Sequence, residues 1–597
     1  MFRSTLEFLQ DLIRCQGPRL WFWWGLTVLL GFSEGVGLIF LAPVLHFLQL
    51  TEPGSVSFQI VHTLDRWIAG IGGQLTLGVA LFGYVLGMGM YSGIQYVQAT
   101  LRARMGQRFL VYFRSRLYRA VARMDWLSFT RQVRGDIVQI LTTEMDRIGI
   151  AVWHLLHTVV SAMMAAVYLV FAGLISLPMT VGVLSTGILL GPVLHLGLRR
   201  SRRWGDQWVD AYRQVHRVIQ AHLDGMKLIH SYGLQEQHVR YFERTIQRMG
   251  EIYERVTRWH RGIAIGIMWG SALLVAILLY TGLAIFRLPR ADVLILVYLF
   301  FRLLPRGFAI YQGLQEWVHH LPSYTEVRRV EQWALRHAVF TGQADPMPPL
   351  SRSIRLEAVT FGYRQEQPVI HDLSIEIPAG QITAIVGHSG AGKTTVVDII
   401  MGLLRPWTGT VWIDGIPLTE RTCRSWQQQI GYVPQDPVLF HDTIRANLLW
   451  ARPDATEDEL WQALEAAGAD FVRRLPEGLD TRVGDRGIRL AGGERQRIAL
   501  AQALVRRPRC LILDEFTSAL DSLTETRILD TIQRLRGTTT IVMVTHRIPS
   551  VRIADRIYVL MNGRVMETGT WTELTGRSHS RFAGMLQQFL PEVTKEK

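Results

Sequence analysis

Hydrophobic residues in the first half of the chain gather in long runs, separated by stretches that are polar or basic. A helix needs roughly 20 residues to cross a bilayer. By that measure the runs predict six membrane spans, at 20–48, 75–98, 148–173, 176–198, 262–286 and 291–314. Between spans, RFLVYFRSRLYRAVARM has apolar residues three and four apart, which indicates helices that extend beyond the bilayer. Within 48–74, the amphipathic stretch VSFQIVHTLDRWIAG predicts a further helix on the outer surface.

The pattern changes at residues 341–350, TGQADPMPPL, which are rich in proline and small residues and typical of a linker. From about residue 351, short apolar runs alternate with turns and with helical periodicity, which predicts a soluble α/β domain. We therefore expect an all-α membrane domain over 1–340, with six helices and long cytosolic extensions. The linker over 341–350 and the α/β domain over 351–597 follow it.

Composition fits a chain that is part membrane and part soluble, because 49% of the residues are hydrophobic and 19% are charged. The net charge of +14 would also fit a nucleic-acid-binding protein. The basic residues, however, concentrate in 101–148 and 199–203, beside predicted spans, as in the cytosolic flanks of membrane helices. We therefore expect a lipid bilayer around the chain, both termini in the cytosol and no nucleic-acid partner. The three cysteines lack the spacing of a disulfide framework or a zinc site.

The strongest motif is ITAIVGHSGAGKTTVVDII, which matches the phosphate-binding pattern G-x-x-x-x-G-K-[ST] between a β-rich run and a helical run. Its glycines allow backbone N–H groups to face phosphates. Lys393 would reach the β- and γ-phosphates of ATP, and Thr394 would bind Mg²⁺. The predicted ATP-binding residues of this loop are Gly387, His388, Ser389, Gly390, Ala391, Gly392, Lys393, Thr394 and Thr395.

A second apolar strand, at 510–513, ends in two carboxylates. Asp514 would support Mg²⁺, directly or through water. Glu515 is placed to polarise the attacking water as a general base. Combined with the phosphate loop, the two carboxylates predict an α/β P-loop ATPase domain that hydrolyses ATP.

The remaining motifs of this half resemble, in order and spacing, those of the nucleotide-binding domain of an ABC transporter, over about 352–585. LAGGERQRIALAQAL resembles the family's signature motif, and GYVPQDPVLF resembles its glutamine loop, with Gln435. SALD at 518–521 resembles the loop after the second carboxylate, and VTHR resembles the switch-histidine motif, with His546. FGYR places Tyr363 where the family stacks an aromatic ring on adenine.

The resemblance implies a catalytic set of Glu515, His546 and Gln435, with Thr394, Gln435 and Asp514 at the Mg²⁺. It also implies two nucleotide-binding domains that meet head to tail, so that the signature loop of one chain closes over ATP held by the other. Glycines and a helix N-terminus can supply N–H groups to a phosphate without a lysine. The implied signature-loop contacts are Ala491, Gly492, Gly493 and Glu494.

Ala491 and Glu494 depart from the family pattern, which has Ser and usually Gln at these positions. The missing hydroxyl removes one possible hydrogen bond to the γ-phosphate, and a hydrogen bond to a charged group is worth roughly 1.5–3 kcal/mol. We therefore expect slower hydrolysis than in a serine-bearing relative. Some heterodimeric relatives also have an altered signature, so a heterodimer stays possible. The intact catalytic set favours a homodimer.

Six spans ahead of one nucleotide-binding domain resemble a half-size ABC exporter, in which ATP drives alternating access between two states. Turns near 124–135 and 221–232 are candidates for contacts between the membrane helices and the nucleotide-binding domains, the second with the partner chain. The expected setting is an integral, multi-pass protein of a bacterial inner (cell) membrane, with the nucleotide-binding domain in the cytosol.

Arg302 and Arg306 are the candidate substrate residues, because ionisable side chains within a span are costly and tend to mark function. They lie on one helical face, and their guanidinium groups suit phosphate. They could instead lie near the inner headgroups or pair with Glu34 of the first span. The arginine–proline pattern and the outer segment resemble flippases of lipid-linked oligosaccharides, which implies outward movement of an amphipathic, anionic lipid-linked substrate. The alternatives are a multidrug or peptide exporter and, in another class, an ATP-gated channel or sensor.

Overall fold

The computed structural model describes residues 2–49, 51–53, 55–70, 72–131, 134–339, 342, 344–364, 366–517, 520–577 and 580–589. Contacts within the chain divide it into two units. The first, Met1–Ala122 with Val133–Ala334, is helical. The second, Arg123–Gln132 with Leu335–Lys597, contains all the described strands. The predicted fold class, a helical membrane domain joined to an α/β domain, is confirmed.

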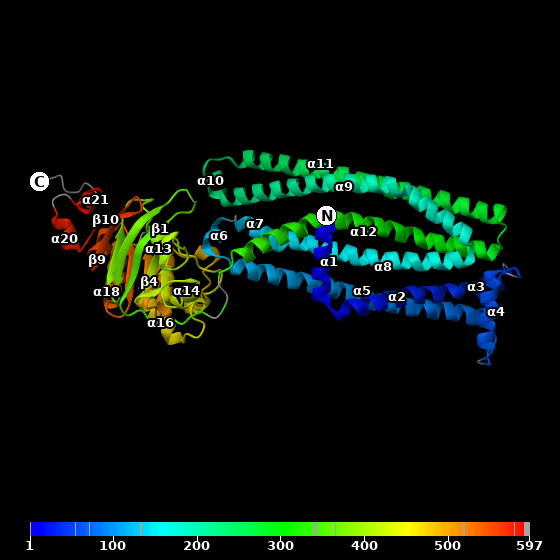
Figure 1. Cartoon of the computed structure of the whole chain (residues 1–597), viewed down its shortest axis with the longest axis horizontal. Coiled ribbons are helices and arrows are strands. Elements are labelled where there is room, and N and C mark those ends of the chain that lie inside the picture. Colours follow the sequence, from blue (N-terminus) through cyan, green and yellow to red (C-terminus); the bar gives the residue numbers. More distant parts are fainter. Residues whose placement is uncertain are drawn as a thin grey trace. The chain divides into compact units, whose positions relative to one another are not determined.

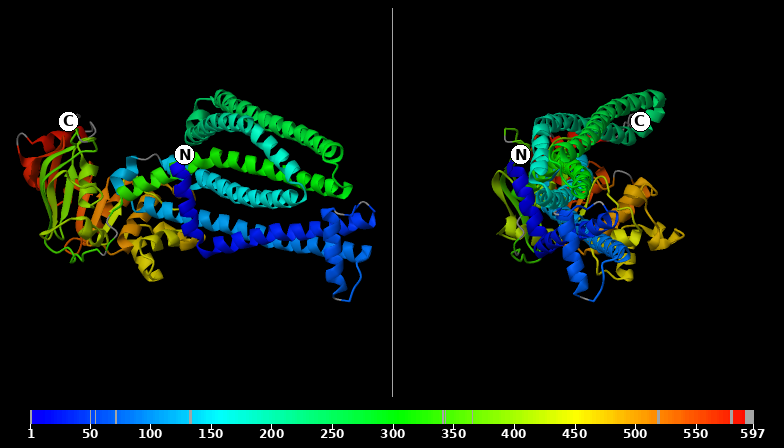
Figure 2. Two further views of the ribbon diagram at one scale, coloured as in Figure 1. Left: turned by 45° about the vertical axis from the view of Figure 1, so that its right-hand side comes forward. Right: turned by 90° about the vertical axis from the view of Figure 1, so that its right-hand side faces the viewer.

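Long helices that lie side by side make up most of the first unit (Figure 1). α2 contacts α5, which contacts α8, while α9 and α11 form a hairpin that is visible from two sides (Figure 2). The arginine-rich part of α5 continues the apolar part without a break, as its periodicity predicts. The elements are α1 (Phe2–Gln16), α2 (Pro18–Ile39), α3 (Leu41–Phe47), α4 (Val56–Ala69), α5 (Leu77–Ala122), α7 (Arg134–Gln139), η1 (Ile140–Glu144), α8 (Met145–Ile175), α9 (Leu177–Asp224), α10 (Met226–Ser231), α11 (Gln235–Tyr280), η2 (Thr281–Ile285) and α12 (Arg290–Arg336).

Four helical stretches among the described residues are long and apolar enough to cross a membrane. They cover the predicted spans at 75–98, 148–173, 262–286 and 291–314 and are Leu77–Ala122, Ile137–Ile175, Gln235–Ile285 and Arg290–Arg336. Helices α2 and α9 occupy the places of the other two predicted spans. The described part of neither helix contains a stretch that meets the same criterion, so the count of six spans stays a prediction.

The first predicted span, 20–48, is not one continuous helix. α2 ends at Ile39, and α3 begins at Leu41 with Pro43 in its first turn. Proline has no N–H group with which to bond the carbonyl four residues earlier, which here is that of Ile39. The break therefore follows from a residue that the hydrophobic pattern alone does not weigh.

Helix α1 crosses the long helices instead of running along them (Figure 1). Phe8, which is fully buried, anchors the crossing. Its ring packs against Phe109 of α5 and against Trp317 and Tyr324 of α12, with centroid distances of 4.5 to 5.4 Å. The apolar face of α1 therefore lies on helices of its own unit.

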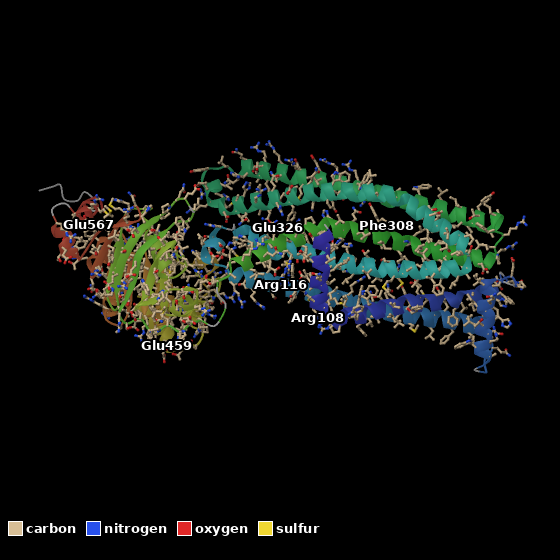
Figure 3. The ribbon with its side chains drawn as sticks, viewed as in Figure 1. Arg108, Arg116, Phe308, Glu326, Glu459 and Glu567 are labelled. Carbon is tan, nitrogen blue, oxygen red and sulfur yellow. The ribbon has the colours of Figure 1, made fainter. Side chains whose placement is uncertain are left out.

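Asp11 brings a carboxylate into this crossing, where it is only 4% exposed. Tyr324 donates a hydrogen bond to it over 2.9 Å, and Arg116 of α5 lies 3.4 Å away, beside the crossing (Figure 3). Arg116 also pairs with buried Glu331, and Arg328 joins the network at 2.5 Å from Glu331. Because both buried carboxylates have cationic partners, neither Asp11 nor Glu331 is left as an uncompensated charge.

Helix α4 confirms the predicted amphipathic helix within 48–74. The Ser55 hydroxyl caps its first turn by accepting from the Phe58 N–H over 3.1 Å. Asp292 of α12, 4% exposed, accepts the N–H groups of Val56 and Ser57 at 3.2 and 3.1 Å. A carboxylate at a helix N-terminus is stabilised by the helix dipole as well as by these bonds. Asp292 therefore fixes one end of α4 to the start of α12.

The second unit contains two sheets. An antiparallel sheet has the order β2-β1-β4-β5, and a six-stranded sheet has the order β10-β9-β3-β8-β7-β6, parallel except for β10. The strands are β1 (Ser353–Phe361), β2 (Ile370–Pro378), β3 (Ile382–Val386), β4 (Thr408–Ile413), β5 (Ile416–Pro417), β6 (Ile430–Val433), β7 (Cys510–Asp514), β8 (Thr540–Val544), β9 (Arg556–Met561) and β10 (Arg564–Gly569).

Helices cover the sheets of this unit (Figure 1). They are α6 (Trp126–Arg131), α13 (Lys393–Ile400), α14 (Glu420–Gln427), α15 (Ile444–Ala451), α16 (Glu457–Ala466), η3 (Asp470–Arg474), η4 (Gly478–Asp480), η5 (Asp485–Gly487), α17 (Gly492–Val505), α18 (Ser522–Arg534), α19 (Ile548–Arg552), α20 (Trp571–Gly576) and α21 (Arg581–Phe589).

Strands β3, β7 and β8 are buried along their whole length, which explains why they appear in the sequence as continuous apolar runs. Alternate residues of β7 face two separate clusters, with Leu511 and Leu513 in one and Cys510 and Ile512 in the other. In an open parallel sheet, ligands bind beyond the carboxyl ends of the strands. These three adjacent strands therefore define the edge at which a site is expected.

The predicted linker at 341–350 is only partly a spacer. Residues 341 and 343 lie outside the described residues, and 344–350 form neither helix nor strand. Met347 and Leu350 are nevertheless buried in the core beside the antiparallel sheet. The second half of the linker therefore packs onto the α/β unit.

Residues 123–131 belong to the second unit although they connect α5 to the helices that lead into α8. Met124 forms an antiparallel bridge with Ala338, just after α12. The N–H of Asp125 donates to His337 over 2.8 Å, and the N–H of Val339 donates to Arg123 over 2.7 Å. The two places where the chain leaves the helical unit are thus joined by backbone hydrogen bonds.

Replacing Asp292 by alanine should free the N-terminus of α4 and lower the stability of the helical unit by about 2 kcal/mol, because two N–H groups lose a charged acceptor. Thermal unfolding of the detergent-solubilised protein, followed by tryptophan fluorescence, measures this loss. Asp292→Asn is the matched control and should lose less, because one acceptor oxygen remains. Equal stability of wild type and Asp292→Ala would contradict the anchoring role.

Candidate nucleotide site

The predicted phosphate loop lies between buried β3 and α13, at the expected edge of the sheet. Gly390 and Gly392 have φ angles of +78° and +96°, which residues with side chains rarely adopt. A Cβ atom on Gly387 would lie 2.3 Å from the Leu560 carbonyl oxygen. The loop therefore requires glycine at these positions, and its tight path leads to the free N–H groups at the start of α13.

The other predicted residues of the loop divide by exposure. His388, Ser389 and Thr394 are exposed, whereas Ala391 and Thr395 are buried. The N–H of Ala391 donates to the His388 carbonyl over 3.1 Å, which closes the turn. The loop thus presents its first residues and the Thr394 hydroxyl outward, while the second half is held by the core.

Lys393 lies across this loop. Its Nζ donates to the carbonyl oxygens of Gly387 and His388 over 2.9 and 3.1 Å. Burial lowers the pKa of the Lys393 ammonium, while the nearby carboxylates Glu515 and Asp514 act in the opposite direction. The ammonium is therefore placed between the loop backbone and the two acids that follow β7.

Glu515 and Asp514 stand at the carboxyl end of β7, as the sequence predicts. Glu515 has a φ angle of +44°, a strained value for this residue type, and its N–H donates to the Val544 carbonyl over 2.8 Å. Burial, together with the adjacent Glu515, raises the pKa of Asp514 to about 6. The backbone thus turns sharply here and directs two neighbouring acids into the site.

The loops that follow the two neighbouring strands, β6 and β8, converge on Glu515. Gln435, which follows β6, donates from Nε2 to Glu515 Oε2 over 2.9 Å. His546, which follows β8, places Nδ1 3.6 Å from Glu515 Oε1. The structure therefore brings together all three predicted catalytic residues, from strands that are far apart in sequence.

Tyr363 follows β1, and its ring is 41% exposed. The ring meets Phe361 edge-on at 5.4 Å, and the hydroxyl lies 3.2 Å from the Thr395 hydroxyl of α13. The predicted aromatic residue is therefore attached to the helix that begins at the phosphate loop, with part of its ring open to a ligand.

Comparison with known protein families decides what this site belongs to. The model of the ABC transporter family matches residues 370–518, and that of the ABC transporter transmembrane region matches residues 27–304. The chain belongs to the ABC transporter family. It is a half-size ABC exporter with an ATP-binding domain, and its transport is coupled to ATP hydrolysis.

Several known proteins are similar over most of the chain. The heterocyst differentiation ATP-binding protein HepA of Nostoc sp. is 32% identical over 75% of this chain and 74% of its own length. The ATP-dependent lipid A-core flippase of Saccharophagus degradans is 27% identical over 85% of this chain and 87% of its own. The structure of a bacterial Atm1-family ABC exporter with ATP bound shares the fold, with a TM-score of 0.81 at 24% identity, over 98% of this chain and all of that one.

The ABC signature loop is built differently from the phosphate loop. Ala491 begins α17 without a side-chain cap, and Glu494 accepts the Ala491 N–H over 2.8 Å. These bonds stay within the loop and its helix. The Glu494 carboxylate bonds the N–H group of Ala491. The N–H groups of Gly492 and Gly493 follow in the first turn of the helix.

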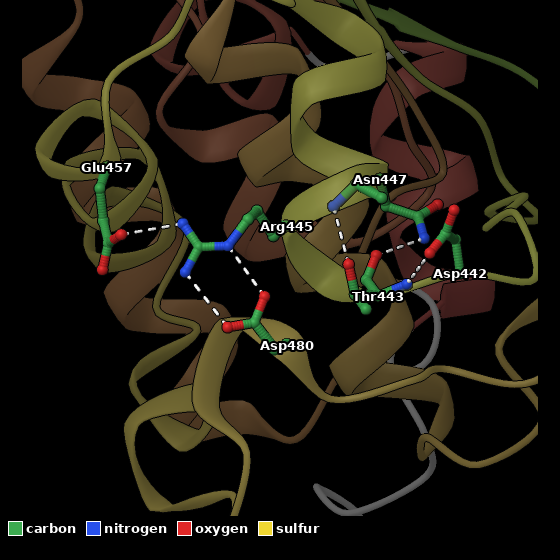
Figure 4. A network of polar contacts seen from close by, with 7 residues as sticks. Asp442, Thr443, Arg445, Asn447, Glu457 and Asp480 are labelled. Atoms are coloured by element: carbon green, nitrogen blue, oxygen red, sulfur yellow. Dashed lines mark hydrogen bonds and ion pairs between the residues drawn. The ribbon is translucent and has the colours of Figure 1, made fainter.

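A polar network fixes the helices around this ABC signature helix (Figure 4). Arg445 of α15 binds Asp480 through Nε at 2.9 Å and Glu457 of α16 through Nη1 at 2.9 Å. Asn447 of the same helix accepts the Phe440 N–H over 2.8 Å. The helices α15 and α16 both contact α17, so the network links the loop after Gln435 to the signature helix.

Two residues at the ABC nucleotide site have no counterpart in the sequence-based prediction. Asp398 of α13 is half-buried near Asp514, and desolvation followed by that charge raises its pKa to about 6. Its position, four residues after Thr394 on one helical face, could have indicated it. Arg131 donates to the Tyr363 carbonyl over 2.5 Å, and no local pattern announces this contact. Of the predicted SALD loop, Ser518 and Ala519 lie outside the described residues.

Replacing Asp514 by asparagine should stabilise the nucleotide-free ABC transporter at pH 7.5 by about 3 kcal/mol, since one pKa unit corresponds to about 1.4 kcal/mol. The pKa of Asp514 is 3.8 in the unfolded chain and about 6 in the folded one. The side chain therefore stabilises the fold below pH 3.8, and this contribution is lost as the pH rises through about 6. The gain should therefore be smaller at pH 5. Unfolding midpoints at the two pH values test this, and a gain independent of pH would contradict it.

Proposed function

We propose that this protein uses ATP to move an amphipathic, anionic lipid-linked substrate from the cytosolic side of the membrane outward. The observation that carries the proposal is an excess of positive charge on α12, within a helix that is apolar enough to span the bilayer. Arg302 and Arg306 lie there among apolar helices, and Glu34 of α2 pairs with Arg302. Two cations facing one anion suit a ligand that brings the missing negative charge.

The two arginines differ in their surroundings. Arg302 pairs with Glu34, whose side chain is 4% exposed, at 3.5 Å, as the alternative to substrate binding anticipated. It also donates to the Tyr298 hydroxyl over 3.1 Å and lies over that ring. Arg306 faces the Tyr91 hydroxyl. We infer that Arg306 supplies the contact with an anionic headgroup, while Arg302 holds Glu34 and orients the cluster.

An apolar cavity at the outer end of the helical unit supports the lipid part of the proposal. It has a volume of about 700 Å³ and lies between α4, α8 and the start of α12. Apolar side chains dominate its lining, among them Leu64, Trp67, Phe171 and Leu299. Such a cavity suits a hydrocarbon chain, because ligand pockets gain affinity from buried apolar surface. The similarity to a lipid A-core flippase is consistent with the same substrate class.

We assign the hydrolytic roles as follows. Lys393 binds the β- and γ-phosphates, Tyr363 stacks on the adenine ring, and Glu515 accepts a proton from the attacking water as general base. His546 and Gln435 hold the Glu515 carboxylate from two sides at 3.6 and 2.9 Å. Positioning of the base, more than its own reactivity, is then the contribution of these two side chains.

The same site fits Mg²⁺. The Gln435 amide nitrogen donates to Glu515, which leaves its amide oxygen available, and Thr394 lies within hydrogen-bonding reach of Asp514. Hydroxyl, amide and carboxylate oxygens are the donors that hard divalent cations prefer. Bound there, the ion would neutralise part of the charge on the β- and γ-phosphates. Gln435, Thr394 and Asp514 are therefore the residues we assign to hold it.

A second copy of the chain would complete the site. Ala491, Gly492, Gly493 and Glu494 of one copy would close over ATP held by the phosphate loop of the other, because a helix N-terminus offers N–H groups to the γ-phosphate. Helix α11 carries exposed apolar side chains on one face, including Trp269 at 71% exposure, which a partner would cover. We favour a homodimer over a heterodimer because Gln435, Glu515 and His546 are all present.

For the placement of the chain we propose a membrane domain over 1–340, a linker over 341–350 and a nucleotide-binding domain over 351–597. Six spans place both termini and the nucleotide-binding domain in the cytosol of a bacterial cell, because the basic segments at 101–148 and 199–203 then flank the inner face. The short helices α6 and α10 lie at the turns expected to meet the nucleotide-binding domains.

Export of drugs is the second candidate, favoured by 28% identity to the ABC multidrug transporter mdr2 of Aspergillus fumigatus over 90% of this chain and 67% of that protein. An apolar cavity would accept many amphiphiles, whereas the Arg306 cluster favours anionic ones. An ATP-gated channel or sensor would not require steady hydrolysis, for which the Glu515 site is arranged.

ATPase rates in lipid nanodiscs test the substrate proposal. A pyrophosphate-linked lipid sugar should stimulate the wild type, and Arg306→Ala should lose most of that stimulation, because the headgroup loses its cationic contact. Arg290→Ala is the matched control, since Arg290 is an exposed arginine at the other end of the same helix. Equal stimulation of wild type and Arg306→Ala would return the arginines to a structural role and favour drugs or peptides.

Ala491→Ser should raise the rate of ATP hydrolysis, because the added hydroxyl gives the γ-phosphate one more hydrogen bond, with an upper limit of roughly 1.5–3 kcal/mol. Steady-state turnover at saturating ATP measures the effect. Ala499→Ser, in the buried middle of the same helix, controls for a general effect of serine on α17. Unchanged turnover in Ala491→Ser would show that the hydroxyl is not limiting.

A further inference from the structure

The segment 123–131 is held against the nucleotide-binding unit at three points. The first is the backbone pairing of Met124 with Ala338. The second is Leu127, which packs against the core that surrounds the antiparallel sheet. The third is Arg131, whose guanidinium donates to the Tyr363 carbonyl over 2.5 Å. A short helix is therefore fixed at both ends, with an apolar contact between them.

The Arg131 contact leads directly to the nucleotide site. The backbone carbonyl of Tyr363 accepts a hydrogen bond from the Arg131 guanidinium. The Tyr363 hydroxyl lies 3.2 Å from the Thr395 hydroxyl of α13. Tyr363 is thus attached to the phosphate-binding helix through its hydroxyl and to α6 through its backbone carbonyl. A hydrogen bond from a charged donor is shorter and stronger than a neutral one, so loss of Arg131 removes the stronger backbone restraint.

Among the described residues of this neighbourhood, no other contact explains an arginine at position 131. The side chain is exposed, and the recorded partner of its guanidinium is a carbonyl oxygen instead of a carboxylate. The interior of the short helix is already held by Asp125, which caps it by accepting the Ser128 N–H over 2.8 Å. Arg131 is therefore not required to start the helix, and its contact is directed at the loop that carries Tyr363.

We propose that Arg131 is a positioning residue for nucleotide binding. Through its bond to the Tyr363 carbonyl, Arg131 fixes where the Tyr363 ring lies relative to the nucleotide base. The inference rests on the proposed stacking of Tyr363 on adenine. Arg131 lies on the connection from α5 to α8, and the Met124–Ala338 pair joins that connection to the exit of α12. Base binding and the position of these helices are then linked, and by reciprocity a change in either one alters the free energy of the other.

ATPase kinetics of the full-length protein in nanodiscs test this. Arg131→Ala should raise KM for ATP at least about threefold, because the ring loses a charge-assisted restraint, while kcat stays within about twofold. Arg131→Lys should be intermediate, because an ammonium can still donate to one carbonyl. Arg123→Ala is the matched control, an exposed arginine of the same segment, and should behave as wild type.

A ligand without a base separates positioning of the ring from damage to the whole site. Inorganic triphosphate, used as a competitive inhibitor, should have the same inhibition constant in wild type and Arg131→Ala. In a Tyr363→Ala background, Arg131→Ala should raise KM no further, because the ring through which it acts is gone. An inhibition constant that rises together with KM would overturn the proposal in favour of a displaced phosphate loop.

The stacking role of Tyr363 and the positioning role of Arg131 predict different outcomes. A wild-type KM in Tyr363→Ala would overturn the stacking role of Tyr363, and the positioning role of Arg131 with it. A raised KM in Tyr363→Ala together with a wild-type KM in Arg131→Ala would overturn the Arg131 link alone. Additive effects of the two substitutions would also overturn it, since they would show two independent contacts.

Discussion

Two carboxylates stand side by side at the buried end of β7, and their repulsion governs what the surrounding loops supply. Burial and the adjacent Glu515 raise the pKa of Asp514. The ionised form of Asp514 is therefore costly unless a cation lies close to it. Lys393 approaches from the phosphate loop, and Gln435 and His546 approach Glu515 from neighbouring strands. The parallel order of β6, β7 and β8 puts all these groups at one edge of the sheet.

The helical unit contains two clusters of buried charged side chains. Asp11 and Glu331 are buried where α1 crosses α5 and α12, and two arginines balance them. In the apolar part of α12, Glu34 pairs with Arg302 alone among the described residues, while Arg306 lies beside the Tyr91 hydroxyl. A network in which the charges balance is suited to holding helices together. A site with an excess of positive charge is suited to binding an anion.

The chain passes between the helical unit and the second unit at few places. Two of them, after α5 and after α12, are paired by backbone hydrogen bonds as soon as they enter the second unit. Beside that pairing, α6 touches the core through Leu127 and the Tyr363 loop through Arg131. A movement that separated α5 from α12 would have to break or carry this small assembly, which is why its contacts matter for coupling.

The sequence by itself determined the features that depend on neighbouring residues. Gly387 to Thr394 form a phosphate loop because strand, glycines and helix follow one another directly, and the buried strands are visible as unbroken apolar runs. Helix α4 and the long extension of α5 follow from their periodicity. The break within the predicted span at 20–48 also has a local cause, Pro43.

Tertiary structure decided the contacts between residues that are distant in the chain. Arg302 could have met headgroups, substrate or Glu34, and only the packing of α12 beside α2 gave it the carboxylate. Arg131 reaches Tyr363 across 232 positions. Periodicity fixes which face of a helix a residue occupies but not which helix lies opposite, because that choice is made by the packing of whole elements.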